Sequence, residues 1–146
     1  MTQGPLQKTK ILDLTDERGI YGAKMLADLG ADVIRPEPMS GDPLRNRGPF
    51  IENNDGSKLS IWHAFFCSSR RSITLDLESK TGTDQLALML KNIDILLTCP
   101  KSFGVSESNS ILNHINREDL ITIDTCSFRP NCEWSEYLAP DIVAGA

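Results

Sequence analysis

The stretch that most constrains the fold of this chain runs from Ile11 to Glu37 and has the pattern strand, turn, helix, strand. An apolar run over residues 11–14 predicts the first strand, and residues 33–37 predict the second. Between them, apolar side chains recur at helical spacing, at Tyr21, Met25, Leu26 and Leu29. Gly30 is suited to end this helix, because glycine reaches the left-handed conformation at low cost. Such a short unit favours two parallel strands joined by a right-handed crossover.

The rest of the chain repeats this alternation of strands and helices. Further strands are expected at 72–77, 93–97 and 120–126. Helices are expected as a short buried helix at 59–66, from Ser79 to Asn92, after Ser108 or Asn109, and from Pro140 onward. Residues 38–58 are rich in Gly, Pro, Asn and Asp and are expected to form a long loop. We therefore predict a flexible lead-in at 1–9 and an α/β domain at 10–146, with a mainly parallel sheet and helices on both faces.

Composition fits one globular domain, since the 146 residues are 40% hydrophobic and 24% charged. The net charge of −5 argues against a general nucleic-acid binder, which needs a basic surface to displace counterions from phosphates. No apolar run approaches the roughly 20 residues of a membrane span. Because the first ten residues also lack the apolar core of a signal peptide, we expect a cytoplasmic protein with no membrane partner.

The cysteines do not have the spacing of a metal site. None of them forms a CxxC pair, and we expect free thiols at Cys67, Cys99, Cys126 and Cys132. The two histidines are His63 and His114, and we expect no metal site. Because His63 lies in an apolar stretch between Trp62 and Ala64, we interpret it as a packed histidine in preference to a catalytic base.

The turn after the first strand is where such a fold often holds a phosphate against a helix N-terminus. Here it reads TDERGIYG, without GxGxxG, and Asp16 and Glu17 are expected to repel a pyrophosphate. The chain also lacks a P-loop and a GxSxG elbow. Several arginines are candidates to grip an anionic, phosphate-bearing ligand, namely Arg35, Arg45, Arg47, Arg70 and Arg71. The alternative, solvated surface arginines, stays open.

Several stretches of this sequence resemble the class III CoA-transferases, the family of formyl-CoA transferase, carnitine CoA-transferase and α-methylacyl-CoA racemase. They are DLT at 13–15, LADLGADVIRPEP at 26–38, SGDPLR at 40–45, RRSITLDLES at 70–79 and PDIVAGA at 140–146. The resemblance covers nearly the whole chain and implies a Rossmann-like α/β fold. A helix that has only begun at Pro140 leads us to expect the N-terminal part of a longer protein.

The resemblance implies CoA transfer between carboxylic acids, or, in the racemase branch, proton movement α to a CoA thioester. The family's transferases use an aspartate nucleophile in a segment beyond this chain, so we assign no catalytic residue and expect the chain alone to be inactive. Coenzyme A or acyl-CoA is the expected ligand. The resemblance also implies a homodimer of interlocked subunits, or association with the C-terminal part. Residues that we expect to contact CoA are Arg18, Arg35, Arg70, Arg71 and Lys101.

Three turns depart from the family pattern. They are the first turn at 16–19, the segment at 99–103, where only Lys101 keeps a basic character, and the loop at 129–133. These departures leave open a degenerate, non-catalytic copy of the domain with a structural or association role. A stand-alone nucleotide-binding module is a third reading, which the acidic first turn disfavours.

Overall fold

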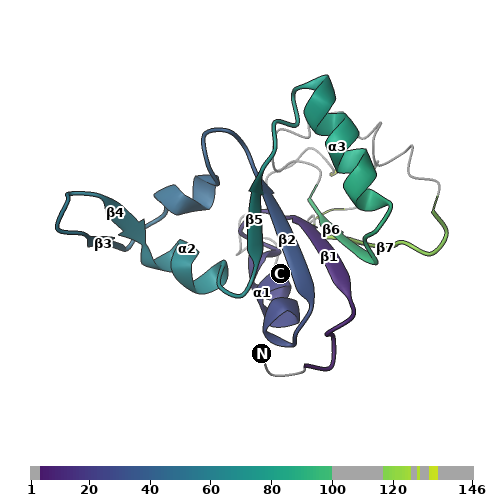
Figure 1. Ribbon diagram of the computed structural model, residues 1–146, viewed down its shortest axis with the longest axis horizontal. Helices are drawn as coiled ribbons and strands as arrows, with labels where there is room; N and C mark the ends of the chain where they lie inside the picture. Colours follow the sequence, from purple (N-terminus) through teal and green to yellow (C-terminus); the bar gives the residue numbers. More distant parts are fainter. Residues whose placement is uncertain (1–3, 100–116, 126–127, 129–131, 135–146) are drawn as a thin grey trace.

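The structure is a computed structural model that describes residues 4–99, 117–125, 128 and 132–134. Five parallel strands form one sheet in the order β5-β2-β1-β6-β7 (Figure 1). Their bounds are β1 Lys10–Leu14, β2 Asp32–Glu37, β5 Arg71–Thr74, β6 Ile95–Thr98 and β7 Ile121–Asp124. The helices are α1 Ile20–Asp28, α2 Ile61–Phe66 and α3 Lys80–Leu90, with a 3-10 turn, η1, at Pro43–Asn46. The predicted α/β fold with a mainly parallel, Rossmann-like sheet is confirmed.

The strand order gives the sheet a switch point between β1 and β6. The chain first moves outward from β1 to β2 and β5, and then returns to the other side of β1 to form β6 and β7. The connections that follow β1 and β6 therefore lead away from each other. In open α/β sheets the crevice at the carboxyl ends of such strands is where ligands bind.

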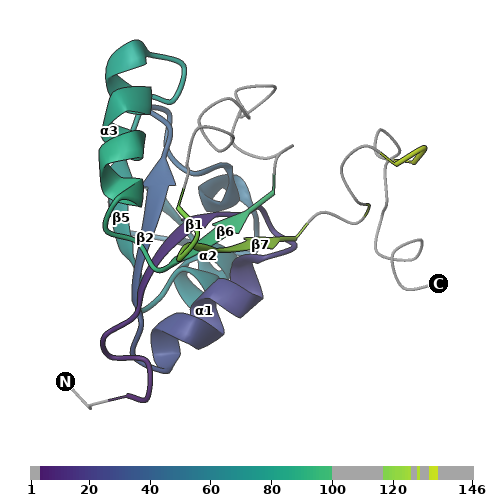
Figure 2. The ribbon, with the colours of Figure 1, turned by 90° about the vertical axis from the view of Figure 1, so that its right-hand side faces the viewer.

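Helices cover both faces of the sheet, as the sequence predicts (Figure 2). Side chains alternate along each strand, so odd and even positions of β1 face different helices. On one face Ile11, Val33 and Leu97 pack with Ala23 and Ala27 of α1. On the other face, leucines of the strands pack with leucines of α3, namely Leu12, Leu14, Leu96, Leu86 and Leu90. The sheet is thus the middle layer of three, with both faces buried.

The buried stripe of α1 differs from the stripe expected from the sequence. Tyr21, Met25 and Leu29 are 56%, 49% and 44% exposed, whereas Ile20, Ala23 and Ala27 are buried. Alanines let the helix approach the sheet closely, and this places the larger apolar side chains outside. Gly30 has a φ of 100°, and its predicted role as the helix stop is confirmed.

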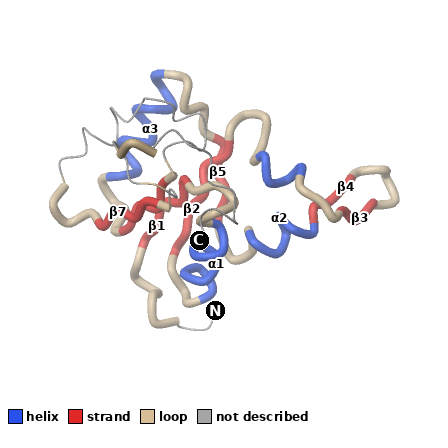
Figure 3. Tube along the Cα trace, turned by 180° about the vertical axis from the view of Figure 1, so that it is seen from behind, coloured by secondary structure: helices blue, strands red, loops and turns tan. Residues whose placement is uncertain are grey.

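The prediction of a long loop at 38–58 is partly wrong. This segment holds η1 and a two-stranded hairpin made of β3 (Phe50–Glu52) and β4 (Lys58–Ser60), which projects away from the sheet (Figures 1 and 3). The following helix α2 was expected to be buried, but Ile61 and Phe65 are 41% and 55% exposed. Its inward face is formed by His63. The apolar side chains at 59–66 therefore form an exposed aromatic surface as well as a part of the core.

The remaining elements are close to their predicted positions. The side chain of Ser79 accepts a hydrogen bond from the backbone N–H of Gly82, which confirms it as the N-cap of α3. The strand predicted at 72–77 ends earlier, at Thr74, where the chain turns toward α3. The helices expected after Ser108 or Asn109 and from Pro140 lie outside the described residues. No helix in the described part of the chain has the length and apolar character needed to cross a membrane.

Candidate functional site

The turn between β1 and α1 lies at the switch point of the sheet. It begins at Thr15, whose backbone N–H and hydroxyl both donate to Asp13 Oδ1, at 3.0 and 2.6 Å. Gly19 ends the turn, and a Cβ at that position would lie 2.5 Å from side-chain atoms of Thr15. The turn therefore needs glycine there, because its two ends approach each other too closely for a larger residue.

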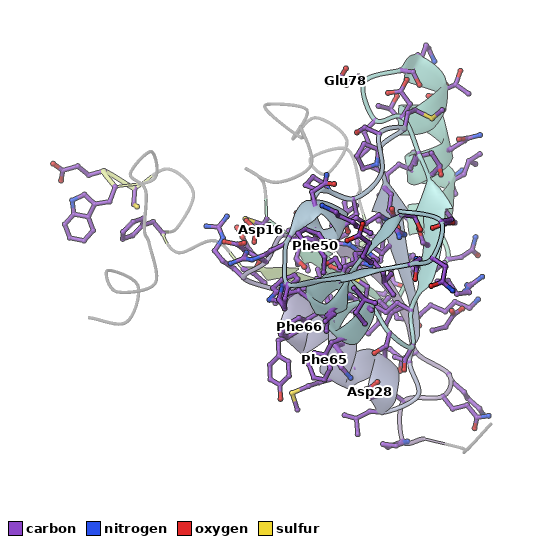
Figure 4. The ribbon with its side chains drawn as sticks, turned by 90° about the vertical axis from the view of Figure 1, so that its left-hand side faces the viewer. Asp16, Asp28, Phe50, Phe65, Phe66 and Glu78 are labelled. Atoms are coloured by element: carbon purple, nitrogen blue, oxygen red, sulfur yellow. The ribbon has the colours of Figure 1, made fainter. Side chains whose placement is uncertain are left out.

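Two ion pairs neutralise the acidic residues of this turn. The Arg18 guanidinium donates to both carboxylate oxygens of Asp16, with its Nε 3.1 and 3.0 Å away. Glu17 forms an ion pair with Arg47, whose guanidinium carbon lies 4.8 Å from the centre of the Trp62 ring. Each carboxylate thus has an arginine partner, so the turn is less negatively charged than its sequence indicates, and the expected repulsion of a pyrophosphate by Asp16 and Glu17 stays a prediction. Figure 4 shows Asp16 at this edge of the fold.

The N-terminus of α1 opens toward the same turn. Gly19 is its N-cap and contributes no side-chain hydrogen bond to the first N–H groups. Gly22, in the first turn of the helix, has no heavy atom within 4 Å of an added Cβ. The backbone N–H of Ile20 donates to the carbonyl of Asp16 at 3.2 Å. The N–H groups at a helix N-terminus and the helix dipole together attract anions. Arg18 also donates to Cys99 Sγ at 2.8 Å, which ties the turn to the residue after β6.

A buried ion cluster lies behind the turn, on the α1 side of the sheet. Asp13 is fully buried and pairs with Arg35 Nη1 at 3.0 Å and with Arg70. Arg35 also pairs with Asp42 and donates to the backbone carbonyl of Thr15 at 2.9 Å. Although burial works against its charge, the two aspartates raise the pKa of Arg35 above its ordinary value. The cluster connects β1, β2, the residue before η1 and the residue before β5.

A second, more open ion pair joins β2 to η1. Arg45 donates to both carboxylate oxygens of Glu37, at 2.7 Å each. Glu37 also accepts from the backbone N–H of Asp42 at 3.0 Å and from the hydroxyl of Ser72. The hydrogen bond from Arg45, helped by those from Ser72 and Asp42, lowers the pKa of Glu37 to about 2. Glu37 is therefore a fixed anion that holds the loop after β2.

Three potential metal ligands gather beside this cluster. Ligand atoms of Asp42, His63 and Cys67 all lie within 4.8 Å of one another. Burial lowers the pKa of His63 and raises the pKa of the Cys67 thiol, so both side chains favour their neutral forms. The Ser60 hydroxyl accepts from the backbone N–H of His63 at 3.0 Å and fixes the start of α2.

The arginines expected from the sequence occupy three kinds of position. Arg18 lies in the turn at the switch point, while Arg35 and Arg70 have buried side chains that are 3% and 1% exposed. Arg71 is exposed and pairs with Asp32 at 2.7 Å, at the amino ends of β5 and β2. Lys101 lies outside the described residues. Of the five residues expected to contact CoA, Arg35 and Arg70 are brought together, because both pair with Asp13.

Sequence reasoning missed the carboxylates that organise the site. These are Asp13, Glu37 and Asp42, all of which are buried. One signal was present, because Asp13 and Thr15, like Arg35 and Glu37, are polar residues two apart in otherwise apolar strands. Residues two apart share a face of a strand, and opposite charges on one face of adjacent strands indicate an internal ion cluster.

Comparison with known proteins decides the family. The model of CoA-transferase family III matches residues 6–146. The chain belongs to this family. The fold and the resemblance seen in the sequence agree with the match. Its order of strands, with a first turn at the switch point, is thus the scaffold of a family III CoA-transferase domain.

Named relatives of this family III chain include two CoA-transferases with succinyl-CoA or succinate in their names. It is 38% identical over 88 residues to the succinyl-CoA:(R)-benzylsuccinate CoA-transferase subunit BbsE of Thauera aromatica, covering 60% of this chain and 22% of that protein. It is 34% identical over 108 residues to the succinate–glutarate CoA-transferase of Agrobacterium fabrum, covering 70% and 27%. The chain therefore spans about a quarter of the length of these relatives.

Solved structures agree with the family III fold. A CAIB/BAIF family protein from Brucella suis superposes with a TM-score of 0.66 at 27% identity, covering 84% of this chain and 33% of that one. Rv3272 of Mycobacterium tuberculosis gives a TM-score of 0.76 at 21% identity, covering 96% and 38%. At that lower identity the second likeness supports the fold alone.

Proposed function

We propose that this chain supplies part of the coenzyme A site of a family III CoA-transferase, at the turn between β1 and α1. The observation that carries the proposal is the combination of Arg18 and a helix N-terminus whose N-cap, Gly19, has no side chain to cover it, at the switch point of the sheet. Both features favour an anionic ligand at the edge where ligands of α/β sheets bind. Coenzyme A carries phosphate groups that suit them.

The ion pairs of the turn can be exchanged for a phosphate. The side chains of Arg18 and Asp16 are 33% and 28% exposed, and those of Arg47 and Glu17 are 47% and 53% exposed. Such pairs near the surface contribute only about 0–1 kcal/mol. A phosphate accepts charge-assisted, bidentate hydrogen bonds from arginine, which are roughly twice as strong as neutral ones. We therefore place the direct contact on Arg18, with Arg47 as a second cation beside it.

The buried arginines have a positioning role in this proposal. Arg35 and Arg70 hold Asp13, and Asp13 holds the first residue of the turn through Thr15. A direct phosphate contact from either would have to break a buried ion pair, which is costly. Arg71 lies at the opposite edge of the sheet from the turn, and so we expect it to contribute less to CoA binding than Arg18. Lys101, three residues after β6 in the sequence, is retained as a proposed CoA contact.

The proposed reaction is transfer of CoA from an acyl-CoA to a second carboxylic acid. A carboxylate nucleophile takes the acyl group as a mixed anhydride and releases the CoA thiolate. The thiolate then attacks the enzyme's own carbonyl carbon in the anhydride, forms an enzyme thioester and expels the first carboxylate. The incoming acid reverses these steps and leaves as the new acyl-CoA. The nucleophile is proposed to come from outside this chain. The names of the relatives favour a transferase over a racemase and over a degenerate, non-catalytic copy.

We further propose a homodimer in the cytoplasm as the working state of the whole protein. The exposed apolar side chains of α1 support association, since Tyr21 and Met25 are 56% and 49% exposed. Either a second copy or further chain of the same protein would cover them.

Calorimetric titration of the full-length protein with CoA tests the proposed site. Arg18→Gln removes a charge-assisted contact worth about 1.5–3 kcal/mol, so binding is expected to weaken roughly 10- to 100-fold. Arg71→Gln is the matched control, because it removes an exposed arginine from the amino edge of the sheet. We expect it to change CoA affinity by less than about threefold. Absence of binding at millimolar CoA in the unaltered protein would overturn the proposal and favour the non-catalytic copy.

A further inference from the structure

Three side chains at the junction of the β2–η1 loop and α2 are arranged as a metal-binding group. Ligand atoms of Asp42, His63 and Cys67 lie within 4.8 Å of one another. Cys67 is the C-cap of α2 and follows His63 by four residues, and its backbone N–H donates to the His63 carbonyl at 2.8 Å, so the two residues lie one turn apart at the end of the helix. Asp42 is the residue before η1 and approaches from the other side. The three ligands therefore come from two segments that the chain separates by some twenty residues.

The buried histidine has an unmet requirement for a partner. His63 is 9% exposed, and its Nε2 is a buried atom with no hydrogen-bond partner in the part of the chain that the structure describes. A buried polar atom without a partner costs about 1–3 kcal/mol. Such an atom in a folded protein needs an explanation, and a metal ion bound by the imidazole would supply the missing partner and remove the cost.

The carboxylate is already oriented as ligating carboxylates are. Asp42 Oδ1 accepts from the backbone N–H of Leu44 at 2.9 Å, and Oδ2 accepts from Arg35 Nε. Each carboxylate oxygen has two lone-pair sites, so each keeps one for a cation. Hydrogen bonds of this kind fix the direction of a metal ligand. Asp42 can thus bind a metal without giving up its place in the ion cluster.

From these observations we infer that Asp42, His63 and Cys67 bind a divalent transition-metal ion of the zinc type. An imidazole nitrogen, a thiolate and a carboxylate are donors that Zn²⁺ takes in tetrahedral sites. Zinc–ligand bonds of about 2.0–2.3 Å put such donor atoms roughly 3.3–3.8 Å apart, so no pair has to move together by more than about 1–1.5 Å on binding. Three protein ligands leave one position of the tetrahedron for water or another small ligand.

The charges around the site permit a cation. The neighbouring carboxylates and guanidinium groups are equal in number and balance one another: Asp13, Glu37, Asp42, Arg35, Arg45 and Arg70. The Cys67 thiolate adds one negative charge when it binds the metal. The bound ion joins α2 to the loop after β2, and we expect it to raise the melting temperature of the protein.

Cobalt is the spectroscopic probe for this site. Metal-free full-length protein is titrated with Co²⁺, and the expected result is one ion per chain, with a thiolate-to-cobalt charge-transfer band and the visible bands of tetrahedral cobalt. Zn²⁺ is expected to displace the cobalt and to raise the melting temperature. Absence of the charge-transfer band in the unaltered protein would overturn the inference.

Two variants with matched controls locate the ligands. Cys67→Ser is expected to abolish the charge-transfer band and, like His63→Ala, to weaken cobalt binding at least roughly 10- to 100-fold. Cys132→Ser and His114→Ala are the controls and should retain both the band and the affinity. If His63→Ala does not fold by circular dichroism, Cys67→Ser decides, since Cys67 is only partly buried. An unchanged band in Cys67→Ser would assign the cobalt to another site and refute the proposal.

Discussion

At the scale of a single residue, we expect the buried guanidinium of Arg35 to contribute strongly to the free energy of unfolding. Arg35→Met leaves Asp13 and Asp42 without their shared cation, and breaking a buried ion pair in this way costs about 3–5 kcal/mol. Arg71→Met removes an exposed pair with Asp32 and should cost less than about 1 kcal/mol. Urea denaturation of both variants measures the difference. Equal costs would mean that the cluster around Asp13 is solvated in solution.

Glu37 gives the stability of the fold a definite dependence on pH. Its pKa falls from 4.5 to about 2 on folding, so its ion pair stabilises the fold fully above pH 4.5 and is lost as the pH drops toward 2. The contribution is on the order of 3 kcal/mol near neutral pH. Glu37→Gln should therefore lose stability at pH 7 and converge with the unaltered protein at low pH. Denaturation at several pH values checks this, with Glu52→Gln, an exposed glutamate of β3, as the control.

These residues also explain what the sequence could predict about the site. Arg35 and Arg70 were recognisable as special because they are arginines beside strands. Their partners could not be predicted, because Asp13 meets Arg70 across 57 positions of the chain. Pairing of this kind depends on the order of the strands in the sheet, and this order cannot be read from any short stretch of the sequence. The pairing of Glu17 with Arg47 was hidden for the same reason, and so the sequence did not show that the charge of the turn is balanced by arginines.

At the scale of elements, two glycines at the same position of two helices should respond oppositely to alanine. Gly22 and Gly82 are each the third residue of their helix, α1 and α3. A Cβ at Gly22 meets nothing within 4 Å, so Gly22→Ala should stabilise the protein by about 0.5–1 kcal/mol. A Cβ at Gly82 would lie 1.8 Å from the Asp76 carbonyl oxygen, so Gly82→Ala should destabilise it by about 1–3 kcal/mol. Thermal unfolding of both variants measures the two signs, and stabilisation by both would contradict the close approach at Asp76.

The elements themselves were largely predictable, and the errors have physical causes. Strands and the Ser79 cap follow from local chemistry, so β1, β6 and α3 fell where expected. The prediction for the buried face of α1 was wrong, because helical spacing alone does not show which of two apolar faces packs against the sheet. Small Ala23 and Ala27 face the sheet, and the larger Met25 is left outside. The β3–β4 hairpin was missed because its residues look like a polar loop.

At the scale of the whole molecule, the helices covering the two faces of the sheet differ in what they expose. On the α1 side, the ring of Tyr21 meets the ring of Phe66 of α2 edge-on, with 6.1 Å between the ring centres. The ring centres of Phe65 and Phe66 are 4.9 Å apart, and Figure 4 shows these two residues side by side. Met25 is exposed on the same helix as Tyr21. This surface of α1 and α2 joins several aromatic side chains into one apolar patch. Apolar patches of this kind on a folded protein mark contact surfaces.

We therefore expect the chain to self-associate through the α1 side. Met25→Glu places a charge in this patch, and it should shift the protein toward monomers in sedimentation equilibrium. Leu88→Glu is the matched control, because Leu88 is 58% exposed on α3, on the opposite face of the sheet, against 49% for Met25. It should leave the association constant unchanged, since a charge far from the contact surface affects only solubility. A monomeric unaltered chain, or equal dissociation of both variants, would contradict association through α1 and would leave the edge strand β7, whose residues are all exposed, as the surface to test next.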